Sequence, residues 1–108
     1  MTVLSVYAIF ASAEEAERVG RTVIDEQLAA CINILAPCRS IYRWKGAIEA
    51  ADEVPAILKT DSTKVGDLME RIAALHSYDT PCITAWAVEA VLPRYADWVE
   101  ESVSRIRR

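Results

Sequence analysis

Two long segments that favour β-structure, joined by a two-residue turn, most constrain how this chain folds. Residues 31–44 and 47–60 are rich in apolar and β-branched side chains, and Lys45-Gly46 separates them. Such a pattern predicts a long antiparallel ribbon with a tight turn at its tip. Pro37 predicts a bulge or break in the first strand. Pro55 is expected at an edge or bulge, because proline cannot donate a ladder hydrogen bond.

The rest of the chain alternates between strand and helix signals. Residues 3–10 are apolar throughout, which is typical of a strand buried on both faces. Ser12 followed by Glu15 predicts a capping box at the start of a helix. Further along we expect a helix capped by Asp61 or Ser62, a loop over residues 76–81, a strand over residues 82–89 and a last helix that begins at Pro93.

This order of elements predicts an α+β fold. The strands and helices follow the ferredoxin-like plan, βαββαβ, with an antiparallel sheet and an additional C-terminal helix. The whole chain, residues 1–108, is expected to form a single domain. Hydrophobic residues make up 53% of the chain, and consecutive apolar residues occur in both middle strands. Both faces of these strands therefore need cover, and we expect a second copy of the chain to supply part of it.

Composition argues against several classes of partner. The net charge is −4, and the only basic cluster is Arg105, Arg107 and Arg108, so we expect no nucleic-acid partner. No stretch approaches the roughly 20 apolar residues of a membrane span. The three cysteines form no C-x-x-C pair, so neither a disulfide framework nor a zinc ribbon is expected. Together these features predict a cytoplasmic protein with no membrane segment.

Catalytic patterns are weak in this sequence. The three glycines form neither a P-loop nor a dinucleotide-binding motif. His76 and Cys82 could form a nucleophilic pair, but that chemistry needs hydrogen-bonding distance and a third group that orients the base. A free cysteine is more often a small core residue. We therefore expect a binding protein rather than an enzyme.

Aromatic and charged residues indicate a binding region. Tyr42 and Trp44 lie at the predicted ribbon tip, where aromatic anchors suit an interface or a ligand cleft. Lys59 sits in a strand predicted to be buried, so it needs an anionic partner such as Glu49, or an anionic ligand. His76 offers an imidazole donor to a metal, or else hydrogen-bonds to the backbone as an ordinary loop residue.

Several runs together resemble one known family. Leu28-Ala29-Ala30-Cys31-Ile32-Asn33-Ile34, Ile41-Tyr42-Arg43-Trp44 and Ile57-Leu58-Lys59-Thr60 are similar in order and spacing to the signature runs of the CutA family, the divalent-cation tolerance proteins. The similarity continues through His76, Tyr78, Pro81 and Ile83, and then through Pro93, Tyr95 and Trp98. It covers essentially the whole chain.

The resemblance implies a homotrimer linked to tolerance of copper and other divalent metals. It also implies a metal ion or small ligand bound between subunits, with Trp44, Glu49, Lys59 and Tyr78 lining the cleft. Family-style copper binding uses a cysteine at the end of the first strand together with a histidine before the last strand. The matching positions here are Phe10 and His76, which makes Cys82 a substitute thiol donor. The alternative is a PII-like regulatory module that binds an anionic metabolite or a protein partner.

Overall fold

A computed structural model describes residues 2–104 of the chain, so the C-terminal arginine cluster lies outside the described residues. The elements in chain order are β1 (Val3–Phe10), α1 (Ala13–Asp25), β2 (Cys31–Ile34), β3 (Cys38–Trp44), β4 (Ala47–Asp61), α2 (Val65–Leu75), β5 (Ile83–Ala87) and α3 (Pro93–Ser102). Over the described residues, no helix has both the length and the apolar character needed to cross a membrane.

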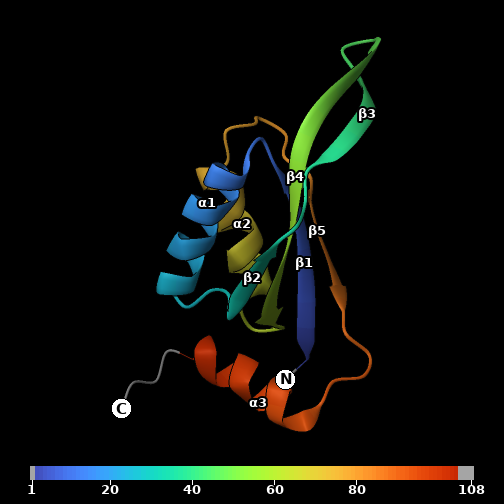
Figure 1. Cartoon of the computed structure of the whole chain (residues 1–108). Helices are drawn as coiled ribbons and strands as arrows, with labels where there is room; N and C mark the ends of the chain where they lie inside the picture. Colours follow the sequence, from blue (N-terminus) through green and yellow to red (C-terminus); the bar gives the residue numbers. More distant parts are fainter. Residues whose placement is uncertain (1, 105–108) are drawn as a thin grey trace.

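The antiparallel sheet has the strand order β2-β4-β1-β5, and β3 pairs with the first half of β4 (Figure 1). This arrangement confirms the α+β, ferredoxin-like prediction with its extra C-terminal helix. Strand β4 is 15 residues long. Its first half pairs with β3 beyond the sheet, and its second half pairs with β2 within the sheet. A single long strand therefore joins the core to the ribbon.

The predicted break at Pro37 is confirmed. Strand β2 ends at Ile34 and β3 begins at Cys38, so the expected long strand is two strands. Pro55 lies in β4 opposite this gap, where its carbonyl accepts a hydrogen bond from the Leu35 N–H at 2.9 Å. The N–H and C=O of a paired antiparallel residue point to the same neighbouring strand. The nitrogen of Pro55 therefore faces the interruption, where its missing proton costs little.

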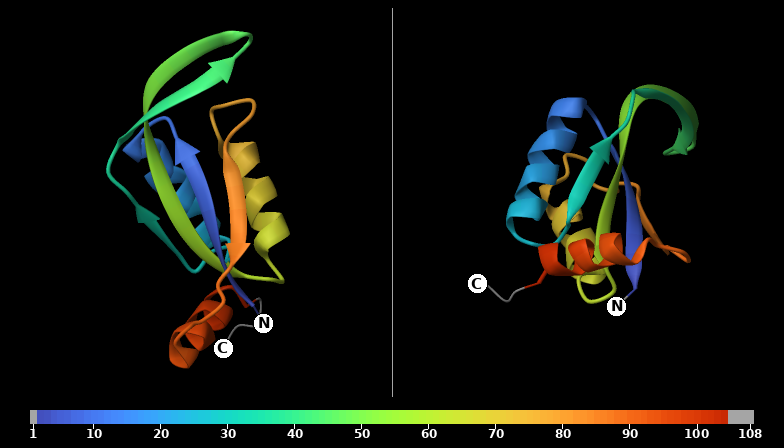
Figure 2. Two further views of the ribbon diagram at one scale, coloured as in Figure 1. Left: turned by 90° about the vertical axis from the view of Figure 1, so that its right-hand side faces the viewer. Right: turned by 60° about the horizontal axis from the view of Figure 1, so that its bottom comes forward.

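Helices α1 and α2 cover one face of the sheet (Figure 2). Alternate β1 side chains, Val6, Ala8 and Phe10, pack there in one fully buried cluster with Leu58 of β4 and Leu68 of α2. A smaller cluster forms at the lower end of the sheet, where α3 packs Val99 and Val103 against Val3 and Ala30. No helix packs over the middle of the opposite face among the described residues.

The two predicted helix starts have different outcomes. Ser12 caps α1 as expected, and its hydroxyl accepts a hydrogen bond from the Glu15 N–H at 3.1 Å. The predicted cap of α2 by Asp61 or Ser62 is wrong, because α2 begins after Lys64 without a side-chain cap. Asp61 ends β4 instead, and its carboxylate accepts hydrogen bonds from the N–H and hydroxyl of Thr63. That carboxylate stabilises the turn and does not reach the helix.

The β3–β4 ribbon bends away from the helices and over the opposite face of the sheet (Figures 1 and 2). Its tip is the predicted tight turn, in which Lys45 and Gly46 have φ values of 51° and 83°. Positive φ at both central residues is the geometry of a type I′ hairpin turn. The ribbon makes the described molecule elongated, with dimensions of 50 × 26 × 22 Å.

Candidate functional site

A pocket of about 660 Å³ lies between the concave face of the ribbon and the loop that follows α2. Ligand sites in proteins commonly fall between about 300 and 1,000 Å³. The lining is mostly apolar and aromatic with a few acidic groups, and consists of Ile9, Ser40, Ile41, Tyr42, Trp44, Glu49, Glu53, Tyr78, Asp79, Thr80 and Cys82. The pocket thus brings together Trp44, Glu49, Tyr78 and Cys82 of the predicted site, whereas His76 and Lys59 are not part of its lining.

A hydrogen bond ties the loop to the ribbon across this pocket. The Tyr78 hydroxyl donates to Glu53 Oε2 at 2.9 Å. Burial raises the pKa of Tyr78 to about 12, with the hydrogen bond to Glu53 and the negative charge of that carboxylate adding to the effect. Tyr78 therefore stays a neutral donor at ordinary pH and holds the carboxylate in place.

Glu53 is the acidic group held most firmly in the pocket. Only 9% of the residue is exposed, and among residues 2–104 no cationic side chain lies within ion-pair distance of it. Tyr78 occupies one of its two carboxylate oxygens, and no donor from the described residues occupies the other. A buried carboxylate is costly unless it is paired. The pocket therefore carries negative charge without a compensating positive one.

His76 supports the loop from beneath. Its ring is buried and stacked on Phe10, with centroids 5.1 Å apart. Nε2 lies 2.7 Å from the Ile9 carbonyl oxygen, and Nδ1 accepts the Tyr78 N–H at 3.0 Å. These partners assign the neutral ring with its proton on Nε2. A metal bound to either nitrogen would have to displace one of these two hydrogen bonds.

Glu15 anchors the same loop to the start of α1. Its two carboxylate oxygens accept hydrogen bonds from the backbone N–H groups of Ala11 and Ser77, at 3.0 and 2.8 Å. Burial alone would raise the pKa of Glu15. The hydrogen bonds outweigh burial and hold that pKa below its usual value. Glu15 and His76 thus position the backbone from which Tyr78 reaches Glu53.

Cys82 is exposed and lines the pocket as a free thiol. Within residues 2–104, no group of three or more histidine, cysteine, aspartate or glutamate side chains has the arrangement of a metal site. The burial and hydrogen bonds of His76 also leave Cys82 without an available imidazole partner. The predicted metal pair of His76 and Cys82 thus stays a prediction, and a complete donor set would need groups from outside the single chain.

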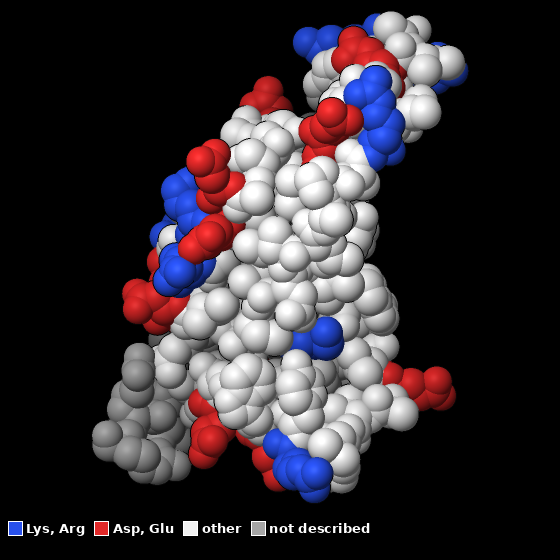
Figure 3. All heavy atoms as spheres, viewed as in Figure 1, with Lys and Arg blue, Asp and Glu red and all other residues white. Residues whose placement is uncertain are grey.

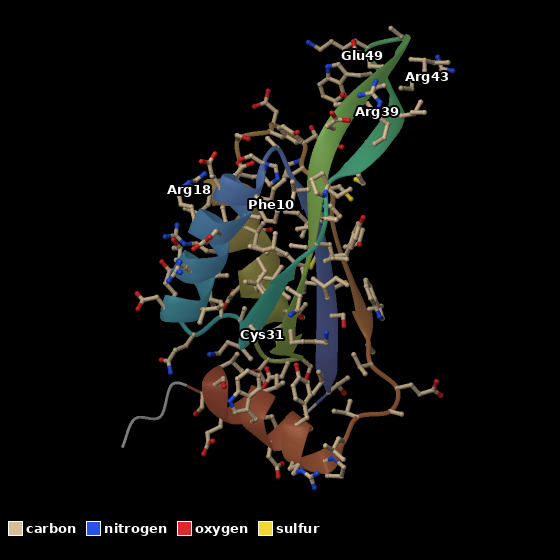
Figure 4. The ribbon with its side chains drawn as sticks, viewed as in Figure 1. Phe10, Arg18, Cys31, Arg39, Arg43 and Glu49 are labelled. Atoms are coloured by element: carbon tan, nitrogen blue, oxygen red, sulfur yellow. The ribbon has the colours of Figure 1, made fainter. Side chains whose placement is uncertain are left out.

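Lys59 lies far from the pocket, so its predicted pairing with Glu49 within one chain is wrong. Both residues are in β4, and ten residues of strand span about 33 Å. Lys59 pairs in register with Cys31 and Ser5 at the lower end of the sheet. Figure 4 shows Cys31 near α3 and Glu49 near the ribbon tip, at opposite ends of the molecule. The sheet register decided this separation.

Glu53 and Asp79 are pocket residues that the predicted set of site residues did not include, whereas Tyr42 belongs to the aromatic pair predicted at the ribbon tip. A signal for Glu53 was available, because Glu49 and Glu53 are four positions apart in one strand. Side chains at even spacing in a strand share a face, so both glutamates point to the concave side of the ribbon. No comparable signal existed for Asp79, since its approach to the ribbon depends on the bend of β3 and β4.

Taken together, the antiparallel sheet with two helices on one face, and the pocket under its curled ribbon, define a ferredoxin-like domain. The description of the CutA1 divalent ion tolerance protein family matches residues 4–102. The chain belongs to this family, which is named for tolerance of divalent cations and not for a reaction.

Individual relatives agree with this assignment. A divalent-cation tolerance protein CutA from Archaeoglobus fulgidus is 43% identical over 98 residues, covering 91% of this chain and 95% of that protein. A solved structure described as a periplasmic divalent cation tolerance protein CutA from Archaeoglobus fulgidus superposes with a TM-score of 0.91 at 41% identity, covering 94% and 99% of the two chains. CutA1 from Oryza sativa superposes at 0.92 with 29% identity, covering 98% and 97%. Cytoplasmic localisation of this chain stays a prediction from its sequence.

Proposed function

We propose that this protein is a non-enzymatic homotrimer that binds a divalent cation, copper included, in the pocket between the ribbon and the 76–82 loop. The observation that carries the proposal is Glu53, a buried carboxylate without a cationic partner in the described chain. Glu49 and Asp79 add two more carboxylates to the same lining, and neither lysine nor arginine contributes to it. Such a pocket favours a cation over an anion.

Cys82 supplies the donor that suits copper best. Thiolates favour soft copper ions, whereas carboxylates favour harder divalent cations. The described chain has no complete group of metal ligands, so the proposed site takes its remaining donors from a neighbouring subunit or from water. His76 serves this site indirectly, because its ring nitrogens are engaged in holding Ile9 and Tyr78.

Exposed apolar side chains support the trimer. The β3–β4 register places Ile41 and Ile48 on the ribbon face opposite Tyr42 and Trp44, with 72% and 71% of their surface exposed. Ile41 also contributes to the pocket lining. Figure 3 shows charged groups over α1 and the ribbon tip, with a largely uncharged surface between them. An isolated ribbon with exposed apolar groups on its convex face would be prone to aggregation. Association with neighbouring copies would cover that face.

The PII-like alternative is weaker at this pocket. An anionic metabolite would have to approach three carboxylates there. Lys59, the residue that favoured such a ligand, lies at the other end of β4 and outside the pocket lining. No observation on the described residues therefore favours the anionic ligand over the cation.

Native mass spectrometry with copper(II), and with zinc(II) as a redox-inert second probe, tests the binding proposal. We expect a species with three times the 12.0 kDa chain mass that takes up metal in a fixed ratio. Glu53→Gln should weaken metal binding at least tenfold. Asp52→Asn is the matched control, because Asp52 is an exposed neighbour that pairs with Arg39 outside the pocket. Equal metal affinity in both variants would refute the assignment of the pocket.

A second pair of variants tests the assembly. Ile48→Asp places a charge on the convex face of the ribbon and should reduce the mass in solution to that of smaller species. Ala73→Asp introduces the same charge at an exposed position of α2 and should leave the trimer intact. Light scattering after size-exclusion chromatography measures both masses. A trimeric Ile48→Asp variant would show that this face of the ribbon is not at the interface.

A further inference from the structure

We propose that the pocket under the ribbon binds a protonated organic amine, with its ammonium group on the free oxygen of Glu53 and its hydrocarbon part against the aromatic wall. This inference rests on the proposal that the pocket is the protein's ligand site, and it names a ligand class other than a bare metal ion. The ammonium supplies the positive charge that the described chain does not provide to Glu53.

Glu53 defines the charge and the hydrogen bonding of the ligand. Tyr78 occupies Oε2, which leaves Oε1 as an acceptor in a residue that is only 9% exposed. The field around it is negative, because Glu49 and Asp79 line the same pocket and neither lysine nor arginine does. A ligand that brings both a positive charge and an N–H donor would satisfy this carboxylate.

The aromatic wall selects an organic cation over a bare ion. Tyr42, Trp44 and Tyr78 line the pocket, and Trp44 is 43% exposed. The Lys45 ammonium lies 5.9 Å from the centroid of the Trp44 ring, so this ring already attracts one cation. Cations bind to aromatic faces through the ring quadrupole. The volume of about 660 Å³ also leaves room for a small molecule.

The acceptor sites of Glu53 narrow the class of amine. Each carboxylate oxygen has two lone pairs, so Oε1 is unoccupied by donors of the described residues and Oε2 keeps one acceptor site beside the Tyr78 hydroxyl. A quaternary ammonium carries no N–H and would leave Oε1 without a donor. The site is therefore suited to a primary or secondary alkylammonium group with an apolar or aromatic substituent.

Isothermal titration calorimetry on the full-length protein in an amine-free buffer tests the ligand class. The probes are benzylamine as its cation, benzyl alcohol as a neutral analogue, benzoate as an anion and benzyltrimethylammonium as a cation without an N–H. We expect benzylammonium to bind at least tenfold tighter than benzyl alcohol and tighter than benzyltrimethylammonium, and benzoate not to bind. Benzyl alcohol binding as tightly as benzylammonium would overturn the inference, because the carboxylate would then contribute nothing.

Two tryptophan variants test the aromatic wall. Trp44→Leu removes part of this wall and should weaken benzylammonium binding at least fivefold. Trp98→Leu is the matched control, because Trp98 is 44% exposed in α3 and lies outside the pocket. Glu53→Gln should abolish the preference for benzylammonium over benzyl alcohol. Equal benzylammonium affinity in the two tryptophan variants would refute the role of the aromatic wall.

The combined results distinguish this inference from the proposed metal function. Copper bound without any benzylammonium would overturn the amine inference and leave the metal proposal standing. Benzylammonium bound without copper would support the inference and refute metal binding. A trimer that binds neither, with the pocket filled by side chains of a second copy in a crystal structure, would overturn both. In that last outcome, the charge partner of Glu53 would be a cationic side chain of the neighbouring subunit.

Discussion

Replacing Glu15 by glutamine is expected to weaken the fold far more than an ordinary surface change. The Glu15 carboxylate is buried and joins two segments that are far apart in the sequence. One oxygen accepts the Ala11 N–H before α1, and the other accepts the Ser77 N–H in the loop after α2. Glutamine has nearly the same shape but only one acceptor oxygen, so its amide group would face one of these two N–H donors.

The size of the effect follows from these two hydrogen bonds. A hydrogen bond to a charged group contributes about 1.5–3 kcal/mol, and a neutral one about 1 kcal/mol. Glu15→Gln removes one of the charged bonds and converts the other to a neutral bond. The expected loss is therefore about 3 kcal/mol in the free energy of unfolding per chain. The loop that carries His76 and Tyr78 should also become less protected from hydrogen exchange.

Guanidinium denaturation at a fixed protein concentration measures this loss, with Glu14→Gln as the control. Glu14 lies in the same first turn of α1 but is exposed, so the two variants change the same charge near the same helix end. Because the pKa of Glu15 is lowered on folding, its stabilisation is complete above its usual pKa of 4.5 and is lost as the pH falls through the lower folded value.

The wild-type protein should therefore lose more stability than Glu15→Gln between pH 7 and pH 3. Glu15→Gln and Glu14→Gln should differ in their free energies of unfolding by about 3 kcal/mol at pH 7. The difference should be smaller in acid, once the Glu15 carboxylate is protonated. A difference below about 0.5 kcal/mol at pH 7, within the ordinary range of surface substitutions, would refute this account of Glu15.

Two further predictions concern backbone freedom and phenol ionisation. Gly66→Ala should stabilise the protein by about 0.5–1 kcal/mol, since nothing lies within 4 Å of the new Cβ in α2. Gly46→Ala should destabilise it by about 1–2 kcal/mol, since Gly46 has φ of 83°. In denaturation, a Gly46→Ala variant as stable as the wild type would contradict the turn geometry, and a destabilised Gly66→Ala variant would contradict the open position in α2. Ultraviolet titration should show Tyr78 and Tyr95 ionising near pH 12. Tyr78→Phe should remove one of these two ionisation steps, and Glu53→Gln should lower the pKa of Tyr78. An unchanged titration in either variant would disprove the Tyr78–Glu53 contact.

Local patterns in the sequence were sufficient for most of the secondary structure. The apolar run of β1, the Ser12 cap, the Lys45-Gly46 turn and the proline at the start of α3 each depend on neighbours within a few residues. Their energies come from φ preferences, capping hydrogen bonds and burial of one face, and all three can be judged from short stretches of sequence. The start of α2 was misplaced because Asp61 had two local uses, and its carboxylate stabilises the turn.

The site depended on contacts that no local pattern specifies. Glu49 and Lys59 were compatible as a pair by charge alone, and only the register of β4 places Glu49 in the ribbon opposite Tyr42 and Lys59 in the sheet between Cys31 and Ser5. His76 could have been a metal ligand by its chemistry, and only folding placed its ring between Phe10, Ile9 and the Tyr78 amide.

Glu53 and Tyr78 are 25 residues apart in the chain, and they meet because the ribbon bends over the loop that Glu15 and His76 hold in place. Short-range propensities thus determined which elements form. The long-range register and the bend of one strand decided which side chains share a pocket, because those contacts are made between elements and not within them.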